Sequence, residues 1–258
     1  MWKYWRHSWP KEHGAWVILA VSFAIGAVSG AGNLSWQLVL LAAALLAFLG
    51  RADFAEWIRG KKPPKAFPWF LVDALGAAVL LVLLIVNGYR LLLPLAVVSG
   101  VALAVHTFAY AKRSSRKLWV EAIGVVGLAA SAPAAWYVST GELWPKGAAL
   151  WALCALYFTG AVMHVEHLLA ARSGRLRTAQ LLRKLSVAYH LCAVVLAVAV
   201  AYTTGLPWLV STAMVPAWIR AMHPKSSCQH GPLTRVGRAE SLYAAIFASI
   251  LIGVLIKG

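Results

Sequence analysis

Ionisable side chains interrupt one of the long apolar stretches of this chain. His164, Glu166 and His167 lie in the otherwise apolar segment 157–172. Such groups are costly inside a membrane and mark candidate functional sites. Histidine nitrogens bind transition metals or carry protons, and a carboxylate can act as a general acid or base. His164 and His167 are therefore candidate ligands of a divalent metal cofactor, and Glu166 is a candidate catalytic group; a hydrogen-bonded network between helices is the alternative.

The spacing of these three side chains limits what they can do together. Successive residues of an α-helix advance by about 100°, so residues three apart share a face. His164 and His167 thus point the same way, whereas Glu166 points elsewhere. The three side chains cannot all bind one ion without ligands from other helices.

A second acidic pair lies at the end of an earlier apolar stretch. Asp53 and Glu56 are three residues apart and share a face if the helix continues. They are candidate catalytic groups and could together hold a divalent cation. The same spacing also suits a solvated face on which the two carboxylates balance Arg51 and Arg59.

Two further pairs are candidate contacts for a substrate or an anion. Glu12 and His13 begin the first apolar stretch, where the helix dipole favours a carboxylate. Lys112 and Arg113 follow the fourth apolar stretch. A capped helix start at the membrane surface explains Glu12 and His13 equally well.

The composition predicts the scaffold that must position these side chains. Of the 258 residues, 61% are hydrophobic and only 12% are charged, which excludes a soluble globular protein of ordinary composition. We expect an all-α, polytopic transmembrane helical bundle that forms a single integral membrane domain over residues 1–258. The fifth apolar stretch is rich in small residues around Pro133, which suits close helix packing and a kink. The nine expected spans cover about residues 14–31, 35–50, 69–87, 91–111, 119–139, 147–170, 185–204, 206–222 and 240–257.

The basic residues predict the orientation of these spans. A net charge of +16 would suggest nucleic acid as the partner of a soluble protein. Here, however, 21 of the 24 Lys and Arg residues fall in the amino-terminal tail and in every second loop between the spans. The positive-inside rule then places the amino terminus in the cytoplasm and the carboxyl terminus outside. We therefore expect membrane lipids, and no nucleic acid, as partners.

The acidic residues and histidines follow the same asymmetry. With this topology, seven of the eight acidic residues and all eight histidines fall on the cytoplasmic side. This distribution predicts a polar chamber that opens to the cytoplasm and is closed by an apolar outer half. Such a chamber suits an enzyme or a binding site better than an open channel.

The start of the first span carries a family resemblance. Its residues Pro10-Lys11-Glu12-His13-Gly14-Ala15-Trp16 resemble the amino-terminal signature of the YwiC-like family, which consists of bacterial polytopic membrane proteins without an established activity. The length and the number of spans also agree with that family. The resemblance implies a multi-pass protein of the bacterial cytoplasmic membrane.

The arrangement of the spans also resembles the UbiA superfamily of intramembrane prenyltransferases. The shared features are nine spans, a cytoplasmic amino terminus, polar clusters at the cytoplasmic ends of the second and sixth spans, and a basic segment similar to Tyr110-Ala111-Lys112-Arg113. This resemblance implies a transferase that acts on a lipid substrate. The two Asp-rich motifs that hold magnesium and a prenyl diphosphate in that superfamily depart from the pattern here. The first is reduced to Asp53 and Glu56, and the second is replaced by His164, Glu166 and His167.

A competing function uses the same residues. A membrane carrier or binding protein for a metal ion, a proton or a small anion would also need ionisable groups inside the bundle. The sequence predicts where those groups lie but leaves the choice between a transferase and a carrier open.

Overall fold

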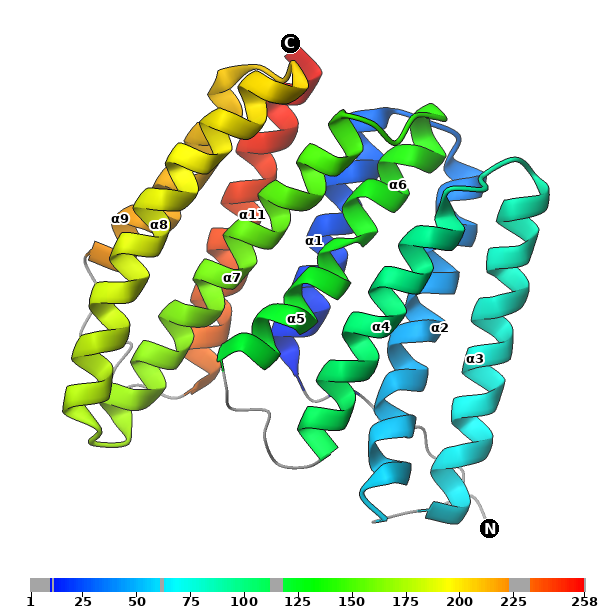
Figure 1. Ribbon diagram of the computed structural model, residues 1–258, viewed down its shortest axis with the longest axis horizontal. Helices are drawn as coiled ribbons and strands as arrows, with labels where there is room; N and C mark the ends of the chain where they lie inside the picture. The colour runs from blue at the N-terminus through cyan, green and yellow to red at the C-terminus, as the bar shows by residue number, and fades with distance from the viewer. Residues whose placement is uncertain (1–9, 11, 61–62, 112–117, 223–232, 258) are drawn as a thin grey trace.

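A computed structural model describes residue 10 and residues 12–60, 63–111, 118–222 and 233–257, and these residues form helices without strands. The chain is an all-α helical bundle, as the composition predicted (Figure 1). Its helices are α1 (His13–Gly30), α2 (Leu34–Ile58), α3 (Pro63–Val86), α4 (Leu92–Ala111), α5 (Leu118–Ala129), α6 (Ser131–Thr140), α7 (Lys146–Arg172), α8 (Leu176–Thr204), the 3₁₀ helix η2 (Trp208–Met214), α9 (Val215–Met222) and α11 (Leu233–Lys257).

The helices run between two edges of the bundle. Figure 1 shows α1 beginning at the lower edge and α11 ending at the upper edge. The lower edge, which we call the basic edge, holds the start of α1, the ends of α2, α4 and α7, and the starts of α3, α5, α8 and α11. Among the described residues, those of the basic edge include Arg51, Arg59, Arg172, Arg175, Arg177, Arg183, Lys184, Arg235 and Arg238, against Arg90, Lys146 and Lys257 at or near the other edge.

Eight helical segments of the described chain are long and apolar enough to cross a membrane. They correspond to the expected spans except the eighth, 206–222, which is not a single α-helix. It consists of η2 with 7 residues and α9 with 8 residues. A 3₁₀ helix rises about 2.0 Å per residue and an α-helix about 1.5 Å, so together they extend roughly 26 Å, close to the hydrocarbon thickness of about 30 Å.

The end of α9 is placed by a hydrogen bond to α8. Arg183 Nη2 donates to the carbonyl oxygen of Met222 at 3.2 Å. This contact puts the end of α9 level with the residue near which the seventh span was expected to begin. The η2–α9 segment therefore returns along α8 over most of its apolar length, and the difference between eight and nine spans concerns this segment alone.

The kink expected in the fifth span is present as a break between α5 and α6. The break falls at Ala130, and the N–H missing from Pro133 would have bonded the carbonyl oxygen of Ala129 four residues earlier. The small residues around the break let α1 approach closely. A Cβ atom at Gly26 would overlap the carbonyl oxygen of Ala132. The side chain of Gln37 joins α2 to the same region by donating to Ala135 O at 2.7 Å.

Candidate functional site

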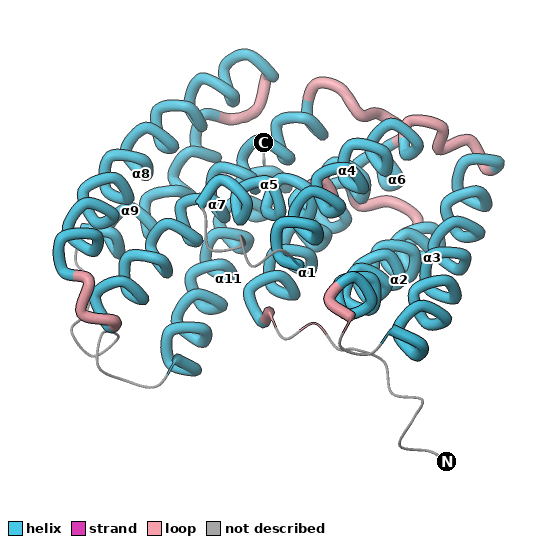
Figure 2. Tube along the Cα trace, turned by 60° about the horizontal axis from the view of Figure 1, so that its bottom comes forward, coloured by secondary structure: helices cyan, strands magenta, loops and turns pink. Residues whose placement is uncertain are grey.

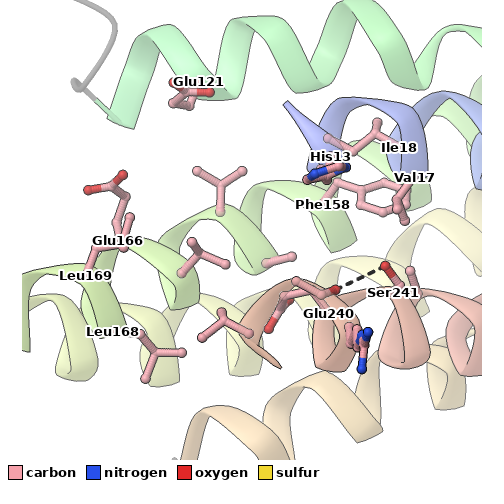
Figure 3. A pocket seen from close by; sticks show the side chains of 18 of the residues that line it. His13, Val17, Ile18, Glu121, Phe158, Glu166, Leu168, Leu169, Glu240 and Ser241 are labelled. Atoms are coloured by element: carbon pink, nitrogen blue, oxygen red, sulfur yellow. Dashed lines mark hydrogen bonds between the residues drawn. The ribbon is translucent and has the colours of Figure 1, made fainter. Parts of the chain in front are cut away.

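A cavity of about 980 Å³ opens at the basic edge between α1, α5, α7 and α11 (Figure 3). We call it the chamber. Most of its wall is apolar and includes Val17, Ile18, Phe158, Leu168 and Leu169. Its ionisable lining residues come from the same four helices, and they are His13, Glu121, Glu166, Arg172, Arg238 and Glu240.

The start of α1 is held at the chamber by local contacts. The indole N–H of Trp16 donates to the carbonyl oxygen of Pro10 at 3.2 Å, and the Trp16 ring packs edge-on against Phe48 with centroids 4.8 Å apart. Glu12 precedes α1 and lies beside α2, where its Oε2 atom is 2.6 Å from Arg51 Nη2. His13 faces the chamber, as Figure 3 shows.

Arg51 connects α1 to a second carboxylate on the chamber wall. Its Nη1 atom lies 3.0 Å from Nδ1 of His106 on α4. The other ring nitrogen of His106, Nε2, lies 3.5 Å from Oε2 of Glu121 in the first turn of α5. The four side chains thus form a continuous row that ends at the chamber. It runs from Glu12, which precedes α1, through Arg51 of α2 and His106 of α4 to Glu121 of α5.

The opposite wall of the chamber carries a paired carboxylate. Glu240 of α11 accepts from Arg220 Nη1 at 2.5 Å, and the Arg220 guanidinium lies 4.8 Å from the centroid of the Tyr243 ring. The Arg220 side chain is only 6% exposed and the Glu240 side chain 17%, so this ion pair is largely buried. The Nε and Nη2 atoms of Arg220 have no hydrogen-bond partner among the described residues.

The histidines of α7 face α8 rather than the chamber. His164 and His167 are buried with ring centroids 6.2 Å apart, while Glu166 lines the chamber, so the helical spacing predicted their directions correctly. Nδ1 of His167 lies 2.9 Å from the carbonyl oxygen of Ala179, and Nδ1 of His190 lies 2.7 Å from that of Ser186. A carbonyl oxygen only accepts, so both Nδ1 atoms donate, and in the neutral rings Nε2 is the acceptor.

The Nε2 atoms of His167 and His190 are buried and have no hydrogen-bond partner among the described residues, so both could serve as metal ligands. Nevertheless, the residues that the structure describes contain no group of three His, Cys, Asp or Glu side chains placed to hold one ion. Arg220 and His190 both lie within electrostatic range of His164. His167 joins α7 to α8 through its contact with Ala179, and the choice between a metal site and a hydrogen-bonded network between helices stays a prediction.

Residues 9–136 match the model of a family described as YwiC-like protein. The chain belongs to the YwiC-like family. The match includes the whole row from Glu12 to Glu121, whereas Glu166, Arg220 and Glu240 lie beyond it. No curated protein and no solved structure matches the chain significantly. The resemblance to the UbiA superfamily stays a prediction.

The first acidic pair of this YwiC-like protein lies away from the chamber. Asp53 of α2 and Asp73 of α3 are buried, at 1% and 2% exposure, and the Glu56 Oε1 atom lies 3.8 Å from Arg59 Nη1. Figure 2 shows α2 and α3 on one side of α1, and α8 and α9 on the other. Asp53 and Glu56 are thus separated from Glu166, with which the sequence grouped them. Lys112 and Arg113 lie outside the described residues.

Four of the residues that shape the site in the YwiC-like chain were not among the candidates predicted from the sequence. Glu121 and Glu240 line the chamber, and His106 and Arg220 contact them from neighbouring helices. Their common signal was the gathering of ionisable residues at one set of span ends. That signal predicts an edge of the bundle but not which residues of different helices meet there.

Proposed function

We propose that this YwiC-like protein binds an amphipathic, lipid-like molecule in the chamber. The observation that carries the proposal is the chamber itself, which combines a volume of about 980 Å³ with a mainly apolar wall and ionisable groups from four helices. Ligand pockets of about 300–1,000 Å³ with apolar walls and a few polar groups are typical small-molecule sites. The apolar wall would take the hydrocarbon chain, and the headgroup would lie at the basic edge.

The reaction that we propose for this site is a transfer on the headgroup of the bound lipid, as the UbiA resemblance implies. Glu166 lies in the chamber wall and would act as general acid or base. Asp53 and Glu56 do not line the chamber, so the proposal assigns them no step in it. His13 is placed to contact the headgroup because it lies in the first turn of α1 and lines the same cavity.

Filling the chamber tests the proposal. Gly237 lines the chamber on α11, and a Cβ atom there would meet no atom within 4 Å, so this position has room for the first atom of a leucine side chain. Gly253 on the same helix is equally open but does not line the chamber, which makes Gly253→Leu the matched control.

Each protein would be purified in a mild detergent, and its bound lipids would be measured by native mass spectrometry and by extraction. We expect a lipid-like molecule on the wild type and on Gly253→Leu, and a loss of most of it from Gly237→Leu. Equal lipid content in all three proteins would contradict a ligand in the chamber.

A second candidate function, a carrier for a small anion or a proton, is favoured by one observation. The buried Arg220 guanidinium has two nitrogen atoms without a partner among the described residues, and it lies within electrostatic range of His164 and His190. Such groups inside a membrane bundle often line an ion or proton pathway. Phosphate or proton flux into proteoliposomes that is lost in Arg220→Gln, together with unchanged lipid content, would favour the carrier over the lipid-binding protein.

A further inference from the structure

We infer that Glu121 receives a protonated amine on the headgroup of the chamber ligand, with His106 and Arg51 as the residues that position it. This inference rests on the proposed binding of an amphipathic molecule and adds the chemical class of its headgroup. It is carried by the row of contacts that ends at Glu121.

The first step concerns the proton on His106. An arginine side chain has donors only, so Arg51 Nη1 must donate to Nδ1 of His106 across their 3.0 Å separation. A histidine that accepts at Nδ1 carries its single proton on Nε2. That nitrogen lies 3.5 Å from Glu121 Oε2, so the N–H dipole of a neutral ring points towards the carboxylate.

The second step concerns the charge along the row. Arg51 is balanced by Glu12 through their 2.6 Å ion pair, and the Arg51 side chain is only 10% exposed. His106 accepts at Nδ1 from Arg51 and presents its Nε2 atom to Glu121. Among the described residues, no lysine or arginine contacts the Glu121 carboxylate. By contrast, Glu240 on the facing wall is neutralised by Arg220.

The third step concerns the position of the carboxylate. Glu121 and Gly124 are three residues apart on α5 and share a face. A Cβ atom at Gly124 would lie 2.7 Å from Cδ2 of His106, so the glycine makes the room that brings the imidazole beside Glu121. The Glu121 side chain is 36% exposed and lines the chamber. It is thus held from behind by His106 and is open to the ligand in front.

A carboxylate that no lysine or arginine of the described chain contacts, with a fixed direction and an open face, favours a cation that can also donate a hydrogen bond. A protonated amine meets both conditions, a hydroxyl group meets only the second, and a phosphate meets neither in its ionised form. Charge-assisted hydrogen bonds are roughly twice as strong as neutral ones. The ligand class is therefore a lipid-like amphiphile with an amine headgroup.

The test compares three probes that share one hydrocarbon chain: dodecylamine, dodecanol and dodecyl phosphate. Apparent dissociation constants would be measured by native mass spectrometry on the full chain in a mild non-ionic detergent. We expect dodecylamine to bind the wild type about tenfold or more tightly than dodecanol. The ratio of the two constants isolates the headgroup, because contributions of the chain and of protein folding cancel in it.

The variants then assign that preference. Glu121→Gln should bring the amine-to-alcohol ratio close to one, and Gly124→Ala should lower it by displacing His106 while leaving every charged residue in place. Glu142→Gln removes an exposed carboxylate beyond α6, away from the basic edge, and should leave the ratio unchanged.

The possible outcomes separate this inference from the proposed function. If none of the three probes binds the wild type, the chamber does not hold an amphiphile and the proposed function fails. If all three bind and are excluded by Gly237→Leu, but dodecylamine has no advantage or Glu121→Gln keeps it, the chamber stands and the amine assignment is overturned. Tightest binding of dodecyl phosphate would likewise overturn it and would assign the headgroup to the chamber arginines.

Discussion

Replacing Gly26 with alanine tests how closely α1 and α6 must approach. The added Cβ atom would lie 2.9 Å from the backbone nitrogen of Trp136 and 3.0 Å from the carbonyl carbon of Ala132, and it would overlap the Ala132 oxygen. Non-bonded carbon contacts are comfortable at about 3.5–4.0 Å, so the helices must separate by roughly 1 Å. Every obstacle is backbone, which cannot rotate away. We therefore expect a loss of about 2–3 kcal/mol, near the upper part of the range for overpacking.

The matched control is Gly253→Ala on α11, where an added Cβ atom meets nothing within 4 Å. Alanine is favoured over glycine inside a helix by about 1 kcal/mol, so this variant should be as stable as the wild type or slightly more stable. Both free energies would be measured by reversible unfolding in mixed micelles of a mild detergent and a denaturing one. Equal stability of the two alanine variants would refute the close approach of α1 and α6.

Three further outcomes can be measured with similar means. Arg220→Leu leaves the largely buried Glu240 carboxylate without its cation and should cost about 3–5 kcal/mol of unfolding free energy. The double variant Arg220→Leu/Glu240→Leu should recover most of this loss, and a double variant no more stable than the single one would contradict a buried ion pair. Gln37→Leu removes interhelical hydrogen bonds to Ala135 and Ser139 and should cost about 0.6–1.7 kcal/mol in the same assay, and an unchanged free energy would argue against those bonds. A reporter enzyme that is active only outside the cytoplasm should be active when it is fused after the last residue and the fusion is expressed in a bacterium. If a fluorescent protein that folds only in the cytoplasm is fluorescent at the same position instead, the number of crossings is even.

Most of the fold follows from the sequence, because long apolar runs in a membrane leave few alternatives to α-helices. The runs at 14–31 and 91–111 differ from α1 and α4 by no more than one residue at either end. The helices at the basic edge extend further than their apolar cores. For example, α8 begins nine residues before the expected span at 185. Arg177, Arg183 and Lys184 in this extension have a high helix propensity, although their charges favour contact with water.

The break at Ala130 was also predictable, since Pro133 removes one backbone donor inside an otherwise continuous span. The path of the chain through 206–222 was not. An apolar segment can form either type of helix with the same composition, so the sequence does not predict that Trp208–Met214 is a 3₁₀ helix packed against α8 and α11.

For the candidate site, the sequence predicted those features that depend on the geometry of a single helix. The 100° step correctly separated Glu166 from His164 and His167, since this depends only on the helix that carries all three. The partners of these residues come from other helices. The contact of His106 with Glu121 depends on Gly124, a residue whose importance lies in the side chain that it lacks, and no local pattern marks it.

The short η2–α9 segment has a consequence for how the protein enters its membrane. Its 15 residues carry less apolar surface than a full span, so it is poorly suited to partition into the bilayer alone. Insertion together with α8, as a preformed hairpin, would bury its backbone against a helix that already crosses. Whether this segment crosses the membrane decides if the number of crossings before α11 is odd or even. It therefore determines on which side of the membrane α11 begins. A failure there would carry Glu240 and Arg238 away from the chamber while leaving the seven preceding spans intact.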